Sequence, residues 1–294
     1  MKKITIAITS SALFDMRESD KVFIESGNVK YKEYQIKNED VPFDTGPSFD
    51  FVSKLLKLNG DNEHVEVVLL SRNSSDTGVR VLNSINHYNL PIVKAVFTKG
   101  RNPYSYLHAF AADLFLSANY NDVRSALVAG FAAATIFPDK PNQQKSKQVR
   151  IAFDGDAVLF SDEAEVIYQK FGLERFMQNE VMKSDMPLAP GPFQNFFLKL
   201  AYLQNTFKDL SESENPIRTV LITARSMPAH ARVIKTIRSW GVHIDEAIYL
   251  AGAKKGDFLK AFNADIYFDD QVHQCESALG KTSVGHVPSG ILNS

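Results

Sequence analysis

The sequence predicts an α/β protein in which parallel strands form sheets that helices cover on both faces. In the second half of the chain, segments of helical periodicity separate three short apolar runs, which are Thr219–Thr223, Ala247–Ala251 and Ala264–Phe268. Continuous apolar runs are typical of strands buried on both faces, and their alternation with helices favours parallel pairing. The first half of the chain follows the same pattern, which predicts two such units.

The predicted elements of the second half follow one another in a regular order. A strand over Val149–Phe153 comes first, and a mostly helical insert from 162 to about 205 follows it, interrupted by the proline-rich segment Pro187–Pro192. A helix from about Pro228 to Trp240 then separates the first two of the three apolar runs. We therefore expect strand, insert, strand, helix, strand, helix and strand.

Comparison of the chain with itself predicts a fused duplication. Residues 7–56 follow residues 152–201 at a constant spacing, so that Ala7 falls on Ala152, and residues 67–127 follow residues 219–279 in the same way. Between the copies, Pro138–Gln148 has the composition of a linker. The expected division is a first domain over residues 1–137, a linker over 138–148 and a second domain over 149–294.

Two carboxylates stand where the strand Val149–Phe153 ends. Asp154 and Asp156 lie on either side of Gly155, and a glycine lets the backbone turn sharply and bring its amide groups toward an anion. Open α/β sheets bind their ligands at the carboxyl ends of their strands. Alone, the pattern also fits a solvated turn, so its meaning depends on the residues that follow.

Polar groups follow the later apolar runs in an order that suits phosphate chemistry. Thr223 ends one run, Lys255 follows the next, and Asp269 and Asp270 follow the last. A hydroxyl and a lysine can bind phosphate oxygens, one carboxylate can attack phosphorus to form an acyl phosphate, and a second acid can protonate the leaving oxygen. Several carboxylates around a phosphate repel one another, so a divalent cation is needed, and oxygen ligands favour magnesium. The pattern indicates phosphoryl transfer.

Four motifs carry a resemblance to a known family, namely DGDAVLFSDE (154–163), LITARS (221–226), AGAKKG (251–256) and IYFDDQ (266–271). They resemble the haloacid dehalogenase-like phosphatase superfamily and, more narrowly, the cytosolic 5'-nucleotidases of type I. In the first half SINHYNL, LFLSAN and AAATIF are similar to the same family, so the resemblance spans nearly the whole chain. It implies two tandem Rossmann-like haloacid dehalogenase-type domains, with a small helical cap insert over about 162–205.

The resemblance also implies a role for each residue of the motifs. Asp154 would be the nucleophile that forms an aspartyl-phosphate, and Asp156 the general acid and base. The expected phosphate-binding residues are Gly155, Thr223, Ala224 and Lys255, and the expected Mg²⁺ ligands are Asp154, Asp156 (through its backbone carbonyl), Asp269 and Asp270. The implied reaction is hydrolysis of nucleoside 5'-monophosphates, AMP in particular, to nucleoside and phosphate.

The first copy lacks the charged residues of the second. At the positions that correspond to Asp154, Asp156, Lys255, Asp269 and Asp270 it has Thr9, Ser11, Pro103, Ser117 and Ala118. Only Thr223 keeps an equivalent hydroxyl, in Ser71. Loss of the acids and the lysine together leaves a neutral, stable pocket, so we expect the first half to be catalytically inactive.

The leaving group is harder to assign. Phe160 and Asp162, beside the catalytic turn, and Arg225, after Thr223, are candidates for substrate contact, although Arg225 fits a solvated or helix-capping residue equally well. Two other functions stay open. The protein could be a phosphatase of another small phosphomonoester such as a sugar phosphate, or it could sense a nucleotide without hydrolysing it.

Composition limits the partners and the compartment. The chain of 294 residues has a net charge of −1 and no long basic run, which does not favour a nucleic-acid partner. Its single cysteine, Cys275, excludes an intramolecular disulfide and fits the cytoplasm. The apolar stretch 125–137 is too short to cross a bilayer, so no membrane partner is expected. The resemblance implies a homo-oligomer.

Overall fold

Ten strands form one mostly parallel sheet in the described part of the chain, which comprises residues 3–139, 146–227 and 229–293 of a computed structural model. The strand order across the sheet is β3-β2-β1-β4-β5-β10-β9-β6-β7-β8. The strands are β1 (Ile4–Ile8), β2 (Val65–Ser71), β3 (Lys94–Phe97), β4 (Leu114–Ser117), β5 (Ala133–Ile136), β6 (Val149–Phe153), β7 (Ile217–Thr223), β8 (Glu246–Tyr249), β9 (Ile266–Asp269) and β10 (Ser283–His286).

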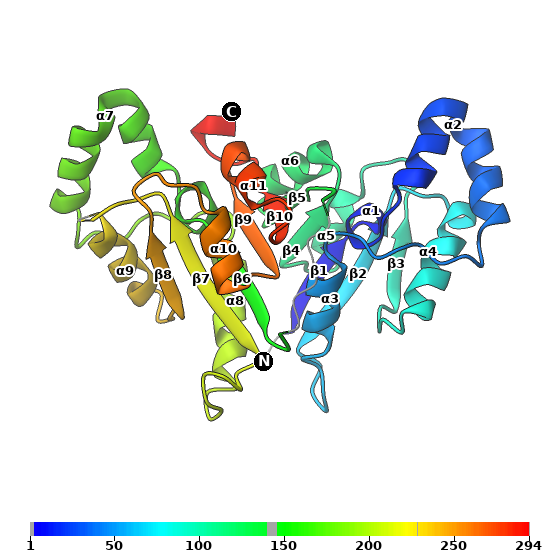
Figure 1. Ribbon diagram of the computed structural model, residues 1–294, viewed down its shortest axis with the longest axis horizontal. Coiled ribbons are helices and arrows are strands. Elements are labelled where there is room, and N and C mark those ends of the chain that lie inside the picture. The colour runs from blue at the N-terminus through cyan, green and yellow to red at the C-terminus, as the bar shows by residue number, and fades with distance from the viewer. Residues whose placement is uncertain (1–2, 140–145, 228, 294) are drawn as a thin grey trace.

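Helices connect the strands and cover the sheet, as the sequence predicts for an α/β protein (Figure 1). The helices are α1 (Ser10–Leu13), α2 (Arg17–Lys37), α3 (Phe49–Leu56), α4 (Ser75–His87), α5 (Tyr106–Ala109), α6 (Tyr120–Val128), α7 (Glu163–Met182), α8 (Gln194–Asn205), α9 (His230–Ser239), α10 (Gly256–Phe262) and α11 (Val272–Ala278). Short turns η1 (Pro103–Ser105), η2 (Gly155–Leu159) and η3 (Ile291–Asn293) complete the set. No helix among the described residues is long and apolar enough to span a bilayer.

The two halves of the chain have the same strand order. The first reads β3-β2-β1-β4-β5 and the second reads β8-β7-β6-β9-β10, each parallel throughout. The two expected sheets are, however, one continuous sheet, because β5 and β10 pair in antiparallel fashion at its centre. In Figure 1 the halves open as a V, with α2 and α7 at its two upper ends.

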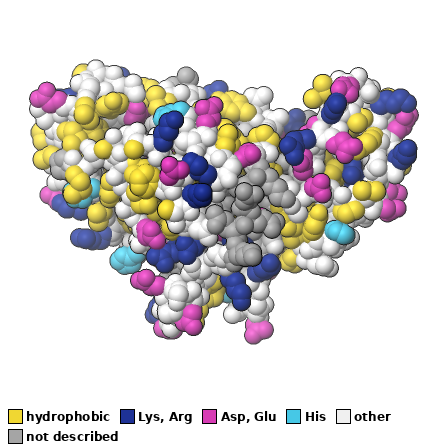
Figure 2. Space-filling view, viewed as in Figure 1, with side chains coloured by type: hydrophobic (Ala, Val, Ile, Leu, Met, Phe, Trp, Pro, Cys, Tyr) yellow, Lys and Arg dark blue, Asp and Glu magenta, His cyan; other side chains and the backbone are white. Residues whose placement is uncertain are grey.

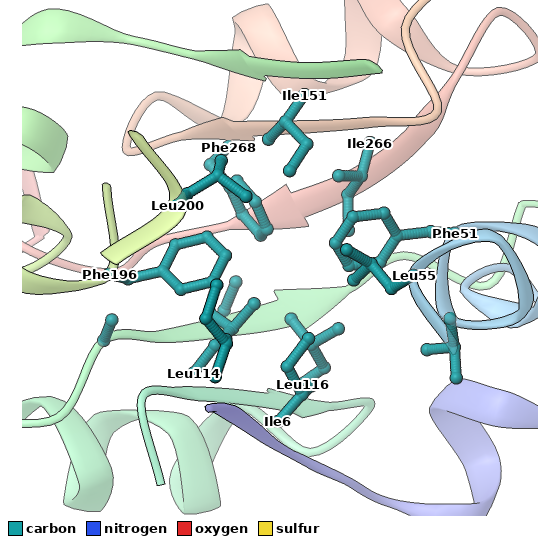
Figure 3. Close-up of a cluster of buried hydrophobic side chains, with 14 of the residues drawn as sticks. Ile6, Phe51, Leu55, Leu114, Leu116, Ile151, Phe196, Leu200, Ile266 and Phe268 are labelled. Atoms are coloured by element: carbon teal, nitrogen blue, oxygen red, sulfur yellow. The ribbon is translucent and has the colours of Figure 1, made fainter. Parts of the chain in front are cut away.

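An apolar core joins the two halves. Phe196 and Leu200 of α8 and Phe268 of β9 lie in the same buried cluster as Leu114 and Leu116 of β4 (Figure 3). Bringing apolar surface of both halves out of water stabilises their association. Within the predicted cap insert, α8 and Leu188 therefore belong to the core, and α7 is the part that protrudes (Figure 1).

Two ion pairs cross between the halves in a reciprocal arrangement. Lys54 of the first half contacts Asp265 of the second at 2.6 Å, and Lys199 of the second contacts Asp113 of the first at 2.5 Å. The sequence alignment of the copies places Lys54 on Lys199 and Asp113 on Asp265. A contact in which equivalent residues exchange partners is the hallmark of two-fold association. The duplication stays a prediction, and these pairs support it.

The protruding helices of the two halves share a break at the same place. Gly27 in α2 has φ 76° and ψ −178°, and Gly172 in α7 has φ 77° and ψ 179°. A positive φ at this position suits glycine. Beyond the break, α7 exposes apolar side chains such as Leu173 and Met182, and Figure 2 shows apolar side chains at this upper-left end, with acidic and basic groups interspersed over the whole face.

Two predicted boundaries lie partly outside the described residues. The predicted linker includes residues 140–145, and the predicted helix start at Pro228 also falls there; α9 itself begins at His230. The division into a first domain, a linker and a second domain stays a prediction.

Candidate active site

The site lies at the carboxyl ends of three adjacent strands of the second half. Asp154 directly follows β6, Thr223 is the last residue of β7, and Asp269 is the last residue of β9. Because β9, β6 and β7 are neighbours in the sheet, residues that the sequence separates by more than a hundred positions meet at one edge. The Asp154 amide fixes the end of β6 by donating to the Phe268 carbonyl oxygen at 2.8 Å.

Three buried carboxylates converge there. One oxygen from each of Asp154, Asp269 and Asp270 lies within 4.8 Å of the others. Oδ1 of Asp270 is buried and has no hydrogen-bond partner among the described residues. A buried carboxylate oxygen without a donor is costly, and a bound cation would remove that cost. The three oxygens therefore fit a divalent cation that prefers oxygen ligands.

Lys255 sits between two of these acids. Its buried Nζ donates to Oδ1 of Asp154 at 2.5 Å and to Oδ2 of Asp269 at 2.6 Å. The next residue, Gly256, packs so tightly that a Cβ there would lie 2.0 Å from the carbonyl oxygen of Ser277. Since one ammonium cannot balance three carboxylates, a net negative charge remains for a divalent cation to neutralise.

The pKa values report the same excess of negative charge. Burial, with a smaller contribution from the charges of Asp269 and Asp156, raises the pKa of Asp154 to about 7 against the opposing effect of Lys255. Burial and the charges of Asp154 and Asp269 raise the pKa of Asp270 to about 9. Burial disfavours the charged form of Lys255, yet its pKa lies above the usual value because Asp154 and Asp269 attract the ammonium.

Asp269 is held by the backbone and by an aromatic residue. Oδ1 accepts from the Gln271 amide at 2.7 Å, and Oδ2 accepts from the hydroxyl of Tyr267 as well as from Lys255. The Tyr267 contact has no signal in the sequence beyond the alternation of residues along a strand. It fixes the rotamer of the acid that lies deepest in the site.

The turn after β6 differs in one respect from the sequence prediction. Gly155 is not the strained residue, because its φ is not positive and a Cβ there would make only ordinary contacts at 3.5 Å. Ala157 has φ 58° instead, and the Phe160 amide donates to the Gly155 carbonyl oxygen at 2.9 Å, which closes a wide π-type turn. A left-handed alanine is uncommon and costs energy, which marks this turn as a constrained one.

Asp156 lies apart from the three converging acids. Its two carboxylate oxygens accept from Nε and Nη2 of Arg225, at 2.8 and 2.7 Å. The expected role of the Asp156 backbone carbonyl as a Mg²⁺ ligand stays a prediction. Thr223 is buried, and its Oγ1 accepts from the Arg225 amide at 3.2 Å. Ala224 follows it and is half-buried.

The three candidates for substrate contact have other partners in the structure. Phe160 is fully buried and packs against Trp240 with ring centroids 5.4 Å apart, so its ring belongs to the core. Asp162 accepts from the Ile291 amide at 2.7 Å and anchors the C-terminal turn. Arg225 is buried and paired with carboxylates, not solvated. All three were plausible from proximity in sequence, which does not specify the direction of a side chain.

Two residues that the sequence did not indicate extend the site. Glu180 of α7 accepts from Arg225 and from Arg232 of α9. Glu180 and Arg232 are both buried. The only available signal was the alignment of the copies, which places Arg232 on Arg80 and Glu180 on Gln35.

Comparison with known proteins agrees with this geometry. The family model described as 5'-nucleotidase matches residues 1–294. The chain belongs to the 5'-nucleotidase family. It is 41% identical over 286 residues to human cytosolic 5'-nucleotidase 1B, an alignment that covers 94% of this chain and 47% of that protein. The chain thus spans about half the length of the curated relative it matches, and the resemblance predicted from the motifs is confirmed.

Proposed function

We propose that the chain is a magnesium-dependent 5'-nucleotidase, a phosphoric monoester hydrolase that converts nucleoside 5'-monophosphates, AMP among them, to nucleoside and inorganic phosphate. The single observation that carries the proposal is the meeting of Asp154, Asp269, Asp270 and Lys255 at one edge of the sheet. Membership in the 5'-nucleotidase family and the name of the human relative support the substrate class.

The first step transfers the phosphoryl group to the protein. A carboxylate oxygen of Asp154 attacks phosphorus and forms an acyl phosphate bond, while the bond from phosphorus to the 5' oxygen of the nucleoside breaks. Asp156 supplies the proton that the leaving 5' oxygen takes up. Lys255, held against Asp154 at 2.5 Å, offsets negative charge on the phosphoryl oxygens, and the Thr223 hydroxyl donates to them.

The second step returns the protein to its starting state. Asp156, now a carboxylate, takes a proton from water, whose oxygen attacks phosphorus as the acyl phosphate bond breaks. This step regenerates the Asp154 carboxylate and releases inorganic phosphate. The net reaction consumes one water and one phosphomonoester, so no oxidant or other reactant is needed.

Asp154, Asp269 and Asp270 are the residues that would hold the cation. Magnesium bound there would neutralise the carboxylates and the phosphate, which otherwise repel one another. The proposal rests on the donor set, in which all three groups offer oxygen, and on the unpartnered Oδ1 of Asp270.

The test is release of inorganic phosphate from a panel of compounds, with and without magnesium. We expect release from nucleoside 5'-monophosphates, much less from 3'-monophosphates and sugar phosphates, and none after chelation of the cation. An equal rate on sugar phosphates would favour a general phosphatase, and nucleotide binding without phosphate release would favour a sensor. Asp270→Asn should raise the magnesium concentration needed for half-maximal rate by about tenfold or more, since a ligand is lost.

Compartment and assembly complete the proposal. The single cysteine and the name of the human relative, which is a cytosolic enzyme, support a cytoplasmic location. A homo-oligomer remains our expectation, and sedimentation of the full chain tests it.

A further inference from the structure

A row of side chains with alternating charge connects the catalytic turn to the protruding helix α7. In order they are Asp156, Arg225, Glu180, Arg232 and Glu163. Asp156 belongs to the turn after β6, the arginines belong to the segment after β7 and to α9, and the glutamates belong to α7. The row therefore joins the part of the protein that holds the reacting groups to the part that stands above them.

All three nitrogens of Arg225 donate to carboxylates. Its Nε and Nη2 donate to the two oxygens of Asp156, at 2.8 and 2.7 Å, and its Nη1 donates to Oε2 of Glu180. The guanidinium also lies over the ring of Phe176, 5.7 Å from its centroid. A two-pronged contact of this kind fixes the orientation of a carboxylate as well as its position.

Glu180 is the junction of the row. It is buried, and its second oxygen accepts from Nη1 of Arg232 at 2.8 Å. Arg232 is fixed in turn by its Nε, which donates to the Met186 carbonyl oxygen at 2.8 Å, and by Glu163 at 2.5 Å. Removing one member of such a buried row leaves an unpaired charge on its neighbour, which is strongly unfavourable.

The first half keeps part of the frame of this row without the acids that contact Arg225. Arg80 donates through Nε to the Val41 carbonyl oxygen at 2.8 Å, as Arg232 does to Met186. Its Nη1 meets Gln35, the equivalent of Glu180, at 3.4 Å. Asn73 stands at the position of Arg225. The half that lacks the catalytic acids thus also lacks Arg225 and the charge of Glu180, which ties these two residues to catalysis.

We propose that Arg225 is a positioning residue that orients the Asp156 carboxyl toward the leaving oxygen, and that Glu180 makes this orientation depend on the position of α7. Glu180 lies beyond the break at Gly172, so a movement of that part of α7 displaces Glu180, then Arg225, then Asp156. The inference rests on the proposed 5'-nucleotidase activity, in which Asp156 transfers the proton. Substrate enclosure by α7 and proton transfer by Asp156 then occur together.

The decisive experiment is a double-mutant cycle on the full chain with a nucleoside 5'-monophosphate. Asp156→Asn should lower kcat by about a hundredfold or more, and Arg225→Asn, which copies Asn73 of the first half, should lower it by a similar factor with KM changed by less than about threefold. Because Arg225 acts through Asp156, the double variant should be no slower than Asp156→Asn alone, within about threefold. Multiplied losses, or a rise in KM, would overturn the inference and assign Arg225 to substrate binding.

Further variants keep the outcome interpretable if Arg225→Asn folds poorly. Arg225→Lys keeps the charge without the two-pronged contact and should show an intermediate loss of kcat, about tenfold. Glu180→Gln, which copies Gln35, should increase backbone hydrogen exchange over 173–182 and lower kcat by about tenfold, again with no added loss in the Asp156→Asn background. An unchanged kcat in Glu180→Gln would contradict the link to α7.

A matched control comes from the first half. Arg80→Lys alters the buried arginine that is equivalent to Arg232 and should leave kcat within about twofold of the original, even where the melting temperature falls. If the unaltered protein released no phosphate from any nucleotide, the proposed function would fail and this inference with it. An active protein with multiplied losses contradicts the inference alone.

Discussion

In the turn after β1, the Phe14 amide donates to the Ser10 carbonyl oxygen, whereas in the turn after β6 the Phe160 amide donates to that of Gly155, one residue further back. Phe14 and Phe160 are structurally equivalent, because Phe14 forms an isolated β-bridge to Thr45 and Phe160 forms one to Pro190. The turn of the second half therefore has one residue more. At the place that Ser11 has in the first turn, the second turn has two residues, Asp156 and Ala157, and the backbone of Ala157 is left-handed.

The framework around these turns is otherwise the same. The Ser71 hydroxyl accepts from the Asn73 amide, and the Thr223 hydroxyl accepts from the Arg225 amide, each at 3.2 Å. The first half also contains an ion pair of its own, in which Arg72 donates to the buried Asp122 at 2.9 Å. Its two charges balance, and the neutral pocket expected in the first half stays a prediction. A scaffold can thus be retained while its reacting groups are lost.

The sharpest difference between the halves should appear when equivalent residues are replaced. Asp154→Asn removes the proposed nucleophile and should reduce kcat by a factor on the order of 10⁴ or more, because an amide of nearly the same shape does not attack phosphorus. Thr9→Val, at the equivalent position, should change kcat by less than about twofold. Steady-state phosphate release measures both, and comparable losses would show that the first half takes part in the chemistry.

Separating the halves tests whether the second can stand alone. Residues 146–294 without residues 1–139 would expose the apolar surface that Phe196, Leu200 and Phe268 share with β4, and exposed apolar surface of that kind promotes aggregation. We expect the fragment to be insoluble or to unfold without cooperativity, and co-expression with residues 1–139 to restore soluble activity. Full activity of the isolated fragment would contradict a structural role for the first half.

Stability should depend on pH in a way that the cation reverses. The native pKa values of Asp154, about 7, and Asp270, about 9, lie above the ordinary value of 3.8, so the native state holds more protons than the unfolded state. The contribution of these two acids to the unfolding free energy therefore falls as the pH rises from about 4 toward 9. Added magnesium binds the ionised native acids and should raise the melting temperature more at about pH 9 than at about pH 6, by about 2–4 °C or more.

Calorimetry in the presence and absence of magnesium measures this difference. Asp269→Asn supplies the control, because loss of a carboxylate from the group should abolish the extra stabilisation at high pH. Equal stabilisation at both pH values would argue against cation binding by these acids.

The smallest expected effect concerns the reciprocal ion pairs between the halves. Lys54→Ala and Lys199→Ala should each lower the unfolding free energy by about 1 kcal/mol or less, since the lysines are partly exposed. Lys54, the more buried of the two, should show the larger loss. Denaturant unfolding measures both, and a marked effect of only one would break the two-fold comparison.

Much of this architecture follows from the sequence for identifiable reasons. Strands such as Val149–Phe153 and Ile266–Asp269 are largely apolar, and Asp154 and Asp269 could be placed at strand ends, with Lys255 in the loop after a strand, from spacing and family motifs. These residues meet because neighbouring parallel strands end at the same edge. The family assignment is confirmed, whereas the catalytic roles stay predictions.

What the sequence did not reveal depends on side-chain direction and on pairing across the molecule. Phe160 sits next to the catalytic turn yet points into the core, and Arg225 turns to Asp156 and Glu180 instead of to solvent. The antiparallel joint between β5 and β10 also had no local signal, because a pairing of four-residue strands is decided by the packing of both halves.

The additional residue in the turn after β6 has a consequence for descent. The spacing of the copies is the same at Gly27 and Gly172 as at Ala7 and Ala152, so the longer turn of the second half is balanced by one residue fewer between that turn and the break in α7. Acids placed at Thr9, Ser11, Ser117 and Ala118 would therefore still lack room in the shorter turn unless the chain after it also shifted by one residue. A return to catalysis there requires this shift of the backbone as well as several point changes in concert. Silencing of that copy is, on this ground, a step that natural variation does not readily reverse.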